Sequence, residues 1–178
     1  MKKAATWSDI KTKLSNIDRP GLLVLLQDLY AANKDNQTFL HARFDVGGDI
    51  LKPYKATISR WLWPDLYGKL DHSVAKAKKA IADYKKAIGR AEDTAELMVF
   101  YCEQAAGFAS EVGLDDGSYY DALVRMYAQA LKSCDALPLQ VREDLHLRLK
   151  NTCALCCNFG YGVYDEVSDL LAMHGIER

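Results

Sequence analysis

The sequence lacks the short motifs that identify several common enzyme classes. It contains no Gly-x-Ser-x-Gly nucleophile elbow, no Walker phosphate loop and no Gly-x-Gly-x-x-Gly dinucleotide fingerprint. Gly160-Tyr161-Gly162 falls in a helical context and predicts a sharp turn rather than a phosphate-binding loop. The histidines are scattered along the chain: His41, His72, His146 and His174. They predict no acid–base dyad, so the sequence favours a protein that is not an enzyme.

Long hydrophobic runs, prolines and net charge are also scarce. The aliphatic run Leu22–Leu26 is too short to span a bilayer, and Met1–Trp7 is not followed by the apolar stretch of a signal peptide. With 4 prolines and 11 glycines in 178 residues, long disordered stretches are not expected. A net charge of −1 leaves only local patches to attract nucleic acid or membrane. We therefore expect one cytoplasmic domain over residues 1–178, with no membrane segment.

Cysteines are few, and one cluster has metal-ligand spacing. In Cys153-Ala-Leu-Cys156-Cys157, three thiols share one face of a helix, and His146 or His174 would complete a tetrahedral zinc site. The second Cys-x-x-Cys pair that makes such a signal strong is missing, and free cysteines are often buried in cores. A redox pair is a further alternative. The favoured interpretation is packed, reduced cysteines, with no metal or other cofactor.

Helical periodicity is present in nearly every segment of the chain. No segment alternates as a strand does, and short breaks separate roughly eight helices. No tetratricopeptide or ankyrin consensus is satisfied. The predicted fold is all-α, built from stacked antiparallel helical pairs, either HEAT-like or an irregular α-bundle.

Apolar stripes predict which side chains enter the core. Three N-terminal helices are expected over residues 7–16, 18–33 and 36–45, and a fourth begins at Asp49 and ends at Pro64. The side chains expected to be buried are Leu22, Leu25, Leu26, Leu29 and Tyr30 in the second helix, Phe39, Leu40 and Phe44 in the third, and Leu51, Tyr54, Ile58, Trp61 and Leu62 in the fourth.

The sign of the charge changes abruptly near Arg90. Residues 69–90 carry seven Lys or Arg against two Asp, whereas residues 91–121 carry eight Asp or Glu and no Lys or Arg. The basic segment has a regular apolar seam from Val74 to Ile88, and the acidic segment predicts the most buried helix, up to Val112. Opposite charge on two neighbouring helices would favour their pairing. Capping boxes are expected at Asp93 and Ser118.

The basic 72–90 helix is the candidate surface for a charged partner. Five lysines lie off its apolar seam and are expected to face outward: Lys76, Lys78, Lys79, Lys85 and Lys86. Cations and aromatic residues also alternate from Lys52 to Lys69, as in nucleic-acid grooves. On the predicted helix, however, the aromatic stripe faces away from Lys52 and Lys55. This separation favours a core stripe with a solvated back over nucleic-acid binding.

Glu96 and Glu103 lie two turns apart on one face of the predicted buried helix. Paired carboxylates are able to serve acid–base or di-iron chemistry, but the chain does not have the two Glu-x-x-His motifs of a ferritin-like site. An enzyme site assembled from these residues with His72 and Tyr101 is one hypothesis. The favoured alternative is that both carboxylates meet the neighbouring basic helix or simply face water.

Several stretches together resemble a known family. They are Lys13-Leu-Ser15, Leu25-Leu-Gln-Asp-Leu-Tyr30, Asn36-Gln-Thr-Phe39-Leu40, Leu51-Lys-Pro53-Tyr54, Trp63-Pro64-Asp65 and Ala80-Ile81-Ala-Asp-Tyr84-Lys85. Over nearly its whole length the chain resembles an uncharacterised bacterial family of small helical proteins, a domain of unknown function. The resemblance implies a bacterial, free-standing cytoplasmic domain, and it carries over no functional residue.

Two classes of function compete on these observations. A non-enzymatic helical module that binds another protein is favoured, because stacked helical pairs offer grooves and the catalytic motifs are missing. The alternatives are nucleic-acid binding through the basic helix and an enzyme with a site around Glu96 and Glu103. The sequence does not identify the partner or the oligomeric state.

Overall fold

A computed structural model describes residues 5–65 and 71–177 of the chain, so Lys69 of the basic segment lies outside the described residues. These residues form nine α-helices, one 3₁₀ turn and no strand. The elements are α1 (Trp7–Leu14), α2 (Arg19–Ala32), α3 (Lys34–Phe44), α4 (Lys52–Leu62), α5 (Val74–Ala87), α6 (Ala91–Val112), α7 (Gly117–Cys134), α8 (Leu139–Leu155), the turn η1 (Cys156–Asn158) and α9 (Val163–Met173). The predicted all-α fold is confirmed.

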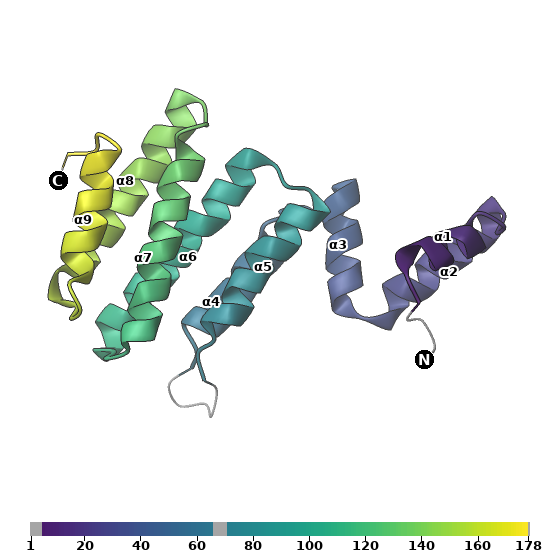
Figure 1. The fold of residues 1–178 in the computed structure, drawn as a ribbon, viewed down its shortest axis with the longest axis horizontal. Helices are drawn as coiled ribbons and strands as arrows, with labels where there is room; N and C mark the ends of the chain where they lie inside the picture. The colour runs from purple at the N-terminus through teal and green to yellow at the C-terminus, as the bar shows by residue number, and fades with distance from the viewer. Residues whose placement is uncertain (1–4, 66–70, 178) are drawn as a thin grey trace.

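The helices follow one another in a row, with α1 and α2 at one end and α9 at the other (Figure 1). Within the row, α4 packs on α5 and α6 on α7, while α8 lies mainly against α6 and α9 against α7. The packing of α4 on α5 and of α6 on α7 agrees with the stacking of helical pairs that the sequence predicts. None of the helices in the described ranges has the length and apolar character needed to cross a bilayer.

The centre of the row is the best-packed part of the molecule. α6 is apolar almost all round and contacts α4, α5, α7 and α8, and it has more buried residues than any other described helix, as predicted. On α7 the apolar side chains form one stripe, which includes the fully buried Leu123, Tyr127 and Leu131. The Tyr127 hydroxyl donates to the Leu149 carbonyl oxygen of α8 at 2.7 Å. Helices α6–α8 therefore share one continuous core.

Local signals explain most helix ends. Asp18 caps α2 by accepting a hydrogen bond from the Gly21 amide, and Gly113 ends α6 with a φ of 63°. The two predicted capping boxes are wrong. α6 begins at Ala91, so Asp93 lies within its first turn and accepts hydrogen bonds from Tyr84 and Arg90.

At the start of α7, Asp116 takes the role predicted for Ser118. The Asp116 carboxylate accepts from the backbone amides of Ser118 and Tyr119, at 2.9 and 3.2 Å. A carboxylate that accepts two orphan amides at a helix N-terminus is a stronger cap than a single hydroxyl. The sequence analysis missed it because Asp116 lies in a run of two acids followed by glycine, which resembles a turn.

The N-terminal helices do not bury the side chains that their periodicity predicts. We call residues 5–50, with α1–α3, the arm and residues 51–177, with α4–α9, the body. In the arm only Ala42 is buried. Leu25, Leu26, Leu29, Tyr30, Phe39 and Phe44 are all exposed, to between 36% and 70%, and Leu22 and Leu40 are only partly buried.

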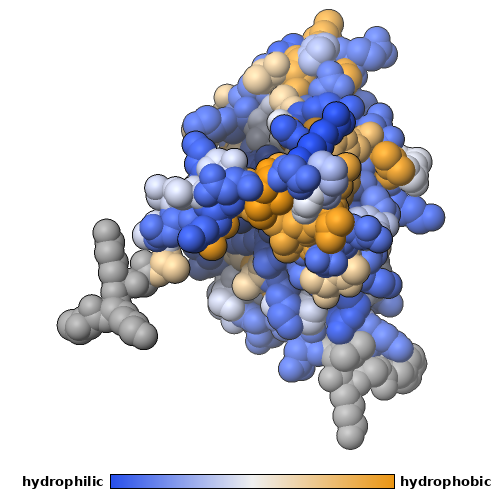
Figure 2. Space-filling model, turned by 90° about the vertical axis from the view of Figure 1, so that its right-hand side faces the viewer, coloured by the Kyte–Doolittle hydropathy of each residue, from blue (hydrophilic) through white to orange (hydrophobic). Residues whose placement is uncertain are grey.

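The reason is that the arm lies at the end of the row, where no further layer covers it. α2 contacts only α3 extensively among the described helices, and α1 has no extensive contact with any of them. Figure 2 views the molecule from this end and shows apolar side chains gathered in the middle of the face. The body, in contrast, buries most of the predicted stripe: Tyr54, Ile58 and Leu62 of α4 are in the core, whereas Leu51 and Trp61 are only partly buried.

Candidate functional site

A large hollow lies where the arm meets the body, between α3, α4 and α5. It has a volume of about 810 Å³, which is within the range of ligand-binding clefts. We call it the lysine groove. Its lining comes from three helices: Lys34, Asp35, Asn36, Thr38 and Phe39 of α3, Pro53, Tyr54, Ala56, Thr57 and Trp61 of α4, and Lys76, Lys79, Ala80, Asp83 and Lys86 of α5.

The floor of the lysine groove is apolar and rigid. Tyr54 and Ala80 are buried, and the Tyr54 ring meets the Tyr84 ring edge-on with 5.3 Å between the centroids. An edge-to-face pair of this kind stabilises the folded state by more than the burial of its apolar surface alone accounts for. Burial raises the pKa of Tyr54, and the nearby Asp83 carboxylate raises it further, so this phenol stays neutral. Phe39 adds an exposed aromatic ring from the α3 side.

Trp61 joins the apolar floor to the charged rim. The Lys76 ammonium lies 3.8 Å from the centroid of its ring and the Arg60 guanidinium 4.4 Å from it, both in cation–π geometry. The predicted separation of aromatic residues from cations therefore fails at Trp61. It fails for two reasons: Lys76 reaches the ring from a different helix, α5, and the neighbouring Arg60 of α4 folds its guanidinium over the ring of Trp61.

The five candidate lysines do not form one surface. Lys76, Lys79 and Lys86 line the groove, whereas Lys78 and Lys85 do not. The division follows from the helical turn, because positions 76, 79 and 86 share one side of α5 and positions 78 and 85 share another. Lys78 is partly buried and its pKa is lowered, first by that burial and then by the Arg125 charge.

The rim of the groove retains positive charge. Lys79 is neutralised by Asp83 at 2.6 Å and lies 3.9 Å from Asp35 of α3, and the hydrogen bond to Asp83 raises the pKa of Lys79. Lys34, Lys76 and Lys86 form no ion pair within the described part of the chain. Their ammonium groups thus remain available to an anionic partner.

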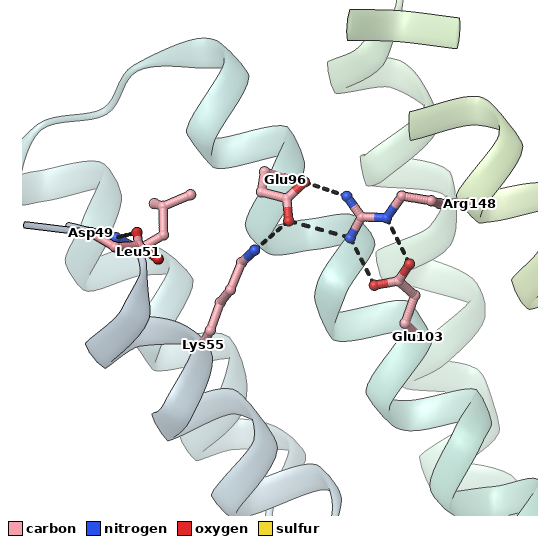
Figure 3. Close-up of polar contacts among 6 residues, drawn as sticks. All are labelled: Asp49, Leu51, Lys55, Glu96, Glu103 and Arg148. Atoms are coloured by element: carbon pink, nitrogen blue, oxygen red, sulfur yellow. Dashed lines mark hydrogen bonds and ion pairs between the residues drawn. The ribbon is translucent and has the colours of Figure 1, made fainter. Parts of the chain in front are cut away.

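Glu96 and Glu103 are held by cations from two other helices (Figure 3). Arg148 of α8 bonds Glu103 in a bidentate arrangement at 2.7 and 2.8 Å and also donates to Glu96. Lys55 of α4 bonds Glu96 at 2.5 Å. The prediction that the two carboxylates meet the neighbouring basic helix or water is wrong: both pair with cations, but these cations come from α4 and α8 and not from α5.

This cluster is built for structure rather than proton transfer. Burial acts to raise the pKa of Glu96, but the hydrogen bonds from Arg148 and Lys55 outweigh it and leave the pKa below its usual value. The same carboxylates, with Glu103 leading, raise the pKa of Arg148. Carboxylates stabilised as anions by a bidentate arginine are poor proton acceptors. They also line neither of the two described hollows.

His72 and Tyr101, the other members of the enzyme hypothesis, lie elsewhere. The His72 ring packs edge-on against Tyr119, with 5.2 Å between centroids, and its Nε2 is 3.7 Å from Asp116. Tyr101 is fully buried, and burial raises the pKa of its hydroxyl. The structure therefore describes no contact that joins these groups to Glu96 or Glu103.

The cysteine cluster agrees with packing rather than metal binding. Cys153 and Cys156 are buried and only Cys157 is exposed. Burial raises the pKa of Cys156 to about 12, so this thiol is protonated in the core. His174 pairs with Asp135 at 3.0 Å. Among the described residues, no three His, Cys, Asp or Glu side chains are grouped as a metal site requires.

Sequence reasoning missed the contributions that come from distant elements. Arg148 was not singled out, although it joins both carboxylates of α6, and Lys34 and Phe39 were not connected with the basic helix. No local pattern marks these residues, because each acts on a helix far along the chain; Arg148 and Glu103, for example, are 45 residues apart.

The chain was compared with models of protein families, with curated proteins and with solved structures, and none of them matched. The resemblance to a bacterial helical family thus stays a prediction.

Proposed function

We propose that this protein is a non-enzymatic helical interaction module that binds an acidic, partly apolar segment of another protein in the lysine groove. The observation that carries the proposal is the combination of an aromatic floor with three rim lysines that have no ion-pair partner among the described residues: Lys34, Lys76 and Lys86. A cytoplasmic, bacterial setting belongs to the same proposal and rests on the resemblance described above.

Charge complementarity defines the partner. Lys79 already has Asp83 and Asp35 as counterions, so an arriving segment meets ammonium groups on both sides of the groove, from α3 and from α5. Acidic side chains would pair with them, while leucine or aromatic side chains would cover the exposed ring of Phe39. An amphipathic helix with apolar residues at i, i+3 and i+7 presents both kinds of group.

Nucleic-acid binding fits the same surface less well. A backbone-binding protein tracks several successive phosphates with clustered cations. Here Lys78 and Lys85 lie away from the groove, Lys79 has carboxylate partners, and Lys76 lies on the ring of Trp61 that a base would need for stacking.

Fluorescence anisotropy with labelled synthetic peptides tests the proposal. The probes are a helical peptide with leucine at i, i+3 and i+7 and glutamate between them, the same peptide with lysine in place of glutamate, and a single-stranded DNA oligonucleotide. We expect binding of the acidic peptide alone. In the variant Lys34→Glu, Lys86→Glu the dissociation constant should rise at least about tenfold, because two ion pairs of up to about 1 kcal/mol each become repulsive.

The matched control is Lys78→Glu, Lys85→Glu, which changes the net charge equally on the other side of α5. It should change the dissociation constant by less than about twofold, since only screened, longer-range interactions are altered. Equal losses in the two variants would indicate non-specific attraction and contradict the groove. Tighter binding of the oligonucleotide than of the acidic peptide, or no binding of that peptide at low salt, would also overturn the proposal.

A further inference from the structure

The apolar surface of the arm is too large for an isolated helix end. The exposed side chains are Trp7, Ile10, Ile17, Leu23, Val24, Leu25, Leu26, Leu29 and Tyr30. From their exposed fractions, their combined area over all sides of the two helices is on the order of 800 Å², so one side offers part of the roughly 800 Å² that one partner contributes to a standard-size protein interface. Figure 2 shows apolar side chains gathered in the middle of the face at this end, and a large apolar patch on a monomer marks an interaction surface.

α2 has the composition of a buried helix. In Arg19–Ala32 only Arg19 and Asp28 are charged, and leucines occupy more than one side of the helix, yet none of its residues is buried. A helix that is apolar on several sides is normally covered on several sides. Here α3 covers one side only, because α1 makes no extensive contact with α2.

The arm is held in place although its apolar side is open. The Asn36 side chain donates to the Leu29 carbonyl oxygen at 2.6 Å, and Gln37 donates to that of Tyr30 at 3.1 Å. At the other end of α3, the Arg43 guanidinium donates to the Ala87 carbonyl oxygen of α5. These polar contacts fix α2 against α3 and α3 against the body, so the uncovered side points away from the molecule.

The two ends of the row differ in the way a self-associating protein requires. At the far end, the exposed side of α9 carries three carboxylates, Asp165, Glu166 and Asp169, together with one large exposed apolar side chain, Met173. This end of the helical stack is therefore mostly polar, as expected of a capping helix. At the near end, α2 presents Leu23, Val24 and Leu26 instead. The stack is thus capped at α9 and open at α2.

We propose that two copies of this chain associate through α1 and α2 in a two-fold symmetric dimer that closes this open end. A second copy suits the surface better than an unrelated protein, because an isologous interface joins a patch to itself and homodimer interfaces are the most apolar class. A single pair of arms closes the assembly, since each α9 end is mostly charged and offers one large exposed apolar side chain, Met173, among its described residues.

Sedimentation velocity of the full chain over a wide range of protein concentration tests this dimer. We expect twice the chain mass at high concentration and the chain mass on dilution. The variant Leu23→Glu, Leu26→Glu places charges on one side of α2 and should remain monomeric at every concentration. Both leucines are exposed in the single chain, so the variant should keep the wild-type circular dichroism spectrum.

The matched control is Leu139→Glu, Leu147→Glu on α8, which alters two equally exposed leucines of the body and should leave the dimer intact. A monomer at all concentrations, or a dimer that survives Leu23→Glu, Leu26→Glu, would overturn the proposal. Co-sedimentation of a monomeric wild-type chain with phosphatidylglycerol vesicles would replace it with membrane binding. The lysine groove uses no residue of α1 or α2, so peptide binding is measured independently of this result.

Discussion

Leu123 of α7 and Leu23 of α2 are both central residues of apolar helices, yet the first is 0% exposed and the second is 58% exposed. The difference lies in their neighbours. α7 has α6, α8 and α9 around it, whereas α2 has α3. Apolar periodicity predicts that one side of a helix has to be covered, but it does not predict whether the same chain or a second molecule covers it. In the body the chain does so itself, and in the arm it does not.

The largest difference between the two regions is expected in the free energy of unfolding. Leu123→Ala should lower it by about 3 kcal/mol, because it removes buried methyl groups and leaves a cavity in the α6–α8 core. Leu23→Ala should change it by less than about 0.5 kcal/mol in dilute, monomeric protein. Urea denaturation at low protein concentration measures both values, and similar losses in the two variants would contradict the contrast.

Removal of Arg148 should destabilise the body by about 2 kcal/mol, since Arg148→Met leaves Glu96 and Glu103 half-buried without their guanidinium partner. Arg125→Met serves as the control, because Arg125 pairs with Asp121 at 3.7 Å on the exposed side of α7. That exposed pair should contribute less than about 1 kcal/mol. Thermal or urea unfolding measures both losses. A larger loss of stability in Arg125→Met than in Arg148→Met would refute a structural role for the cluster.

A smaller effect, about 1 kcal/mol, is expected for Tyr127→Phe, which removes the buried hydrogen bond from α7 to the Leu149 carbonyl oxygen. Tyr30→Phe is the counterpart in the arm, where the hydroxyl bonds His41 at 2.9 Å but is exposed to water. Water replaces that partner, so its loss should be close to zero. Urea denaturation measures the loss in the free energy of unfolding for both variants. Equal losses would argue against the contrast between body and arm.

The smallest expected effect is a change in the acid limb of the stability curve. The pKa of Glu96 is lower in the folded chain than its ordinary value of 4.5, so the unfolded chain binds the proton more readily. The stabilisation is complete above about pH 4.5 and is lost as the pH falls through the folded-state pKa. In Glu96→Gln, urea unfolding at decreasing pH should show a shallower decline, and a decline identical to the wild type would count against this role.

The body could be predicted from the sequence in considerable detail. The seam of α5, with Ala77, Ile81 and Tyr84 in the core, follows directly from its spacing, and α6 is the most buried helix because it is apolar nearly all round. Both inferences depend only on residues within one helix. The capping boxes at Asp93 and Ser118 failed because both helices begin earlier than predicted: α6 starts after Arg90, which makes no side-chain cap, and α7 starts after Asp116, whose carboxylate caps it.

The candidate site could be predicted only in part, because it is assembled across helices. Lysines on α5 were expected to face outward, but which of them share a hollow depends on where α3 and α4 pack. The predicted pairing of the basic helix with the acidic helix that follows it also depends on how distant helices pack. Within the described residues, no α5 lysine pairs with an α6 carboxylate, and the partners of Glu96 come from α4 and α8.

Hydrogen–deuterium exchange at two protein concentrations tests the contrast between arm and body most directly. The amides of α7 should show the same strong protection at both concentrations, because the body is complete in a single chain. Protection of α2 should be weak in dilute protein and rise with concentration, as a second copy covers Leu23 and Leu26. Protection of α2 that is independent of concentration would contradict the conclusion that this helix is covered only on association.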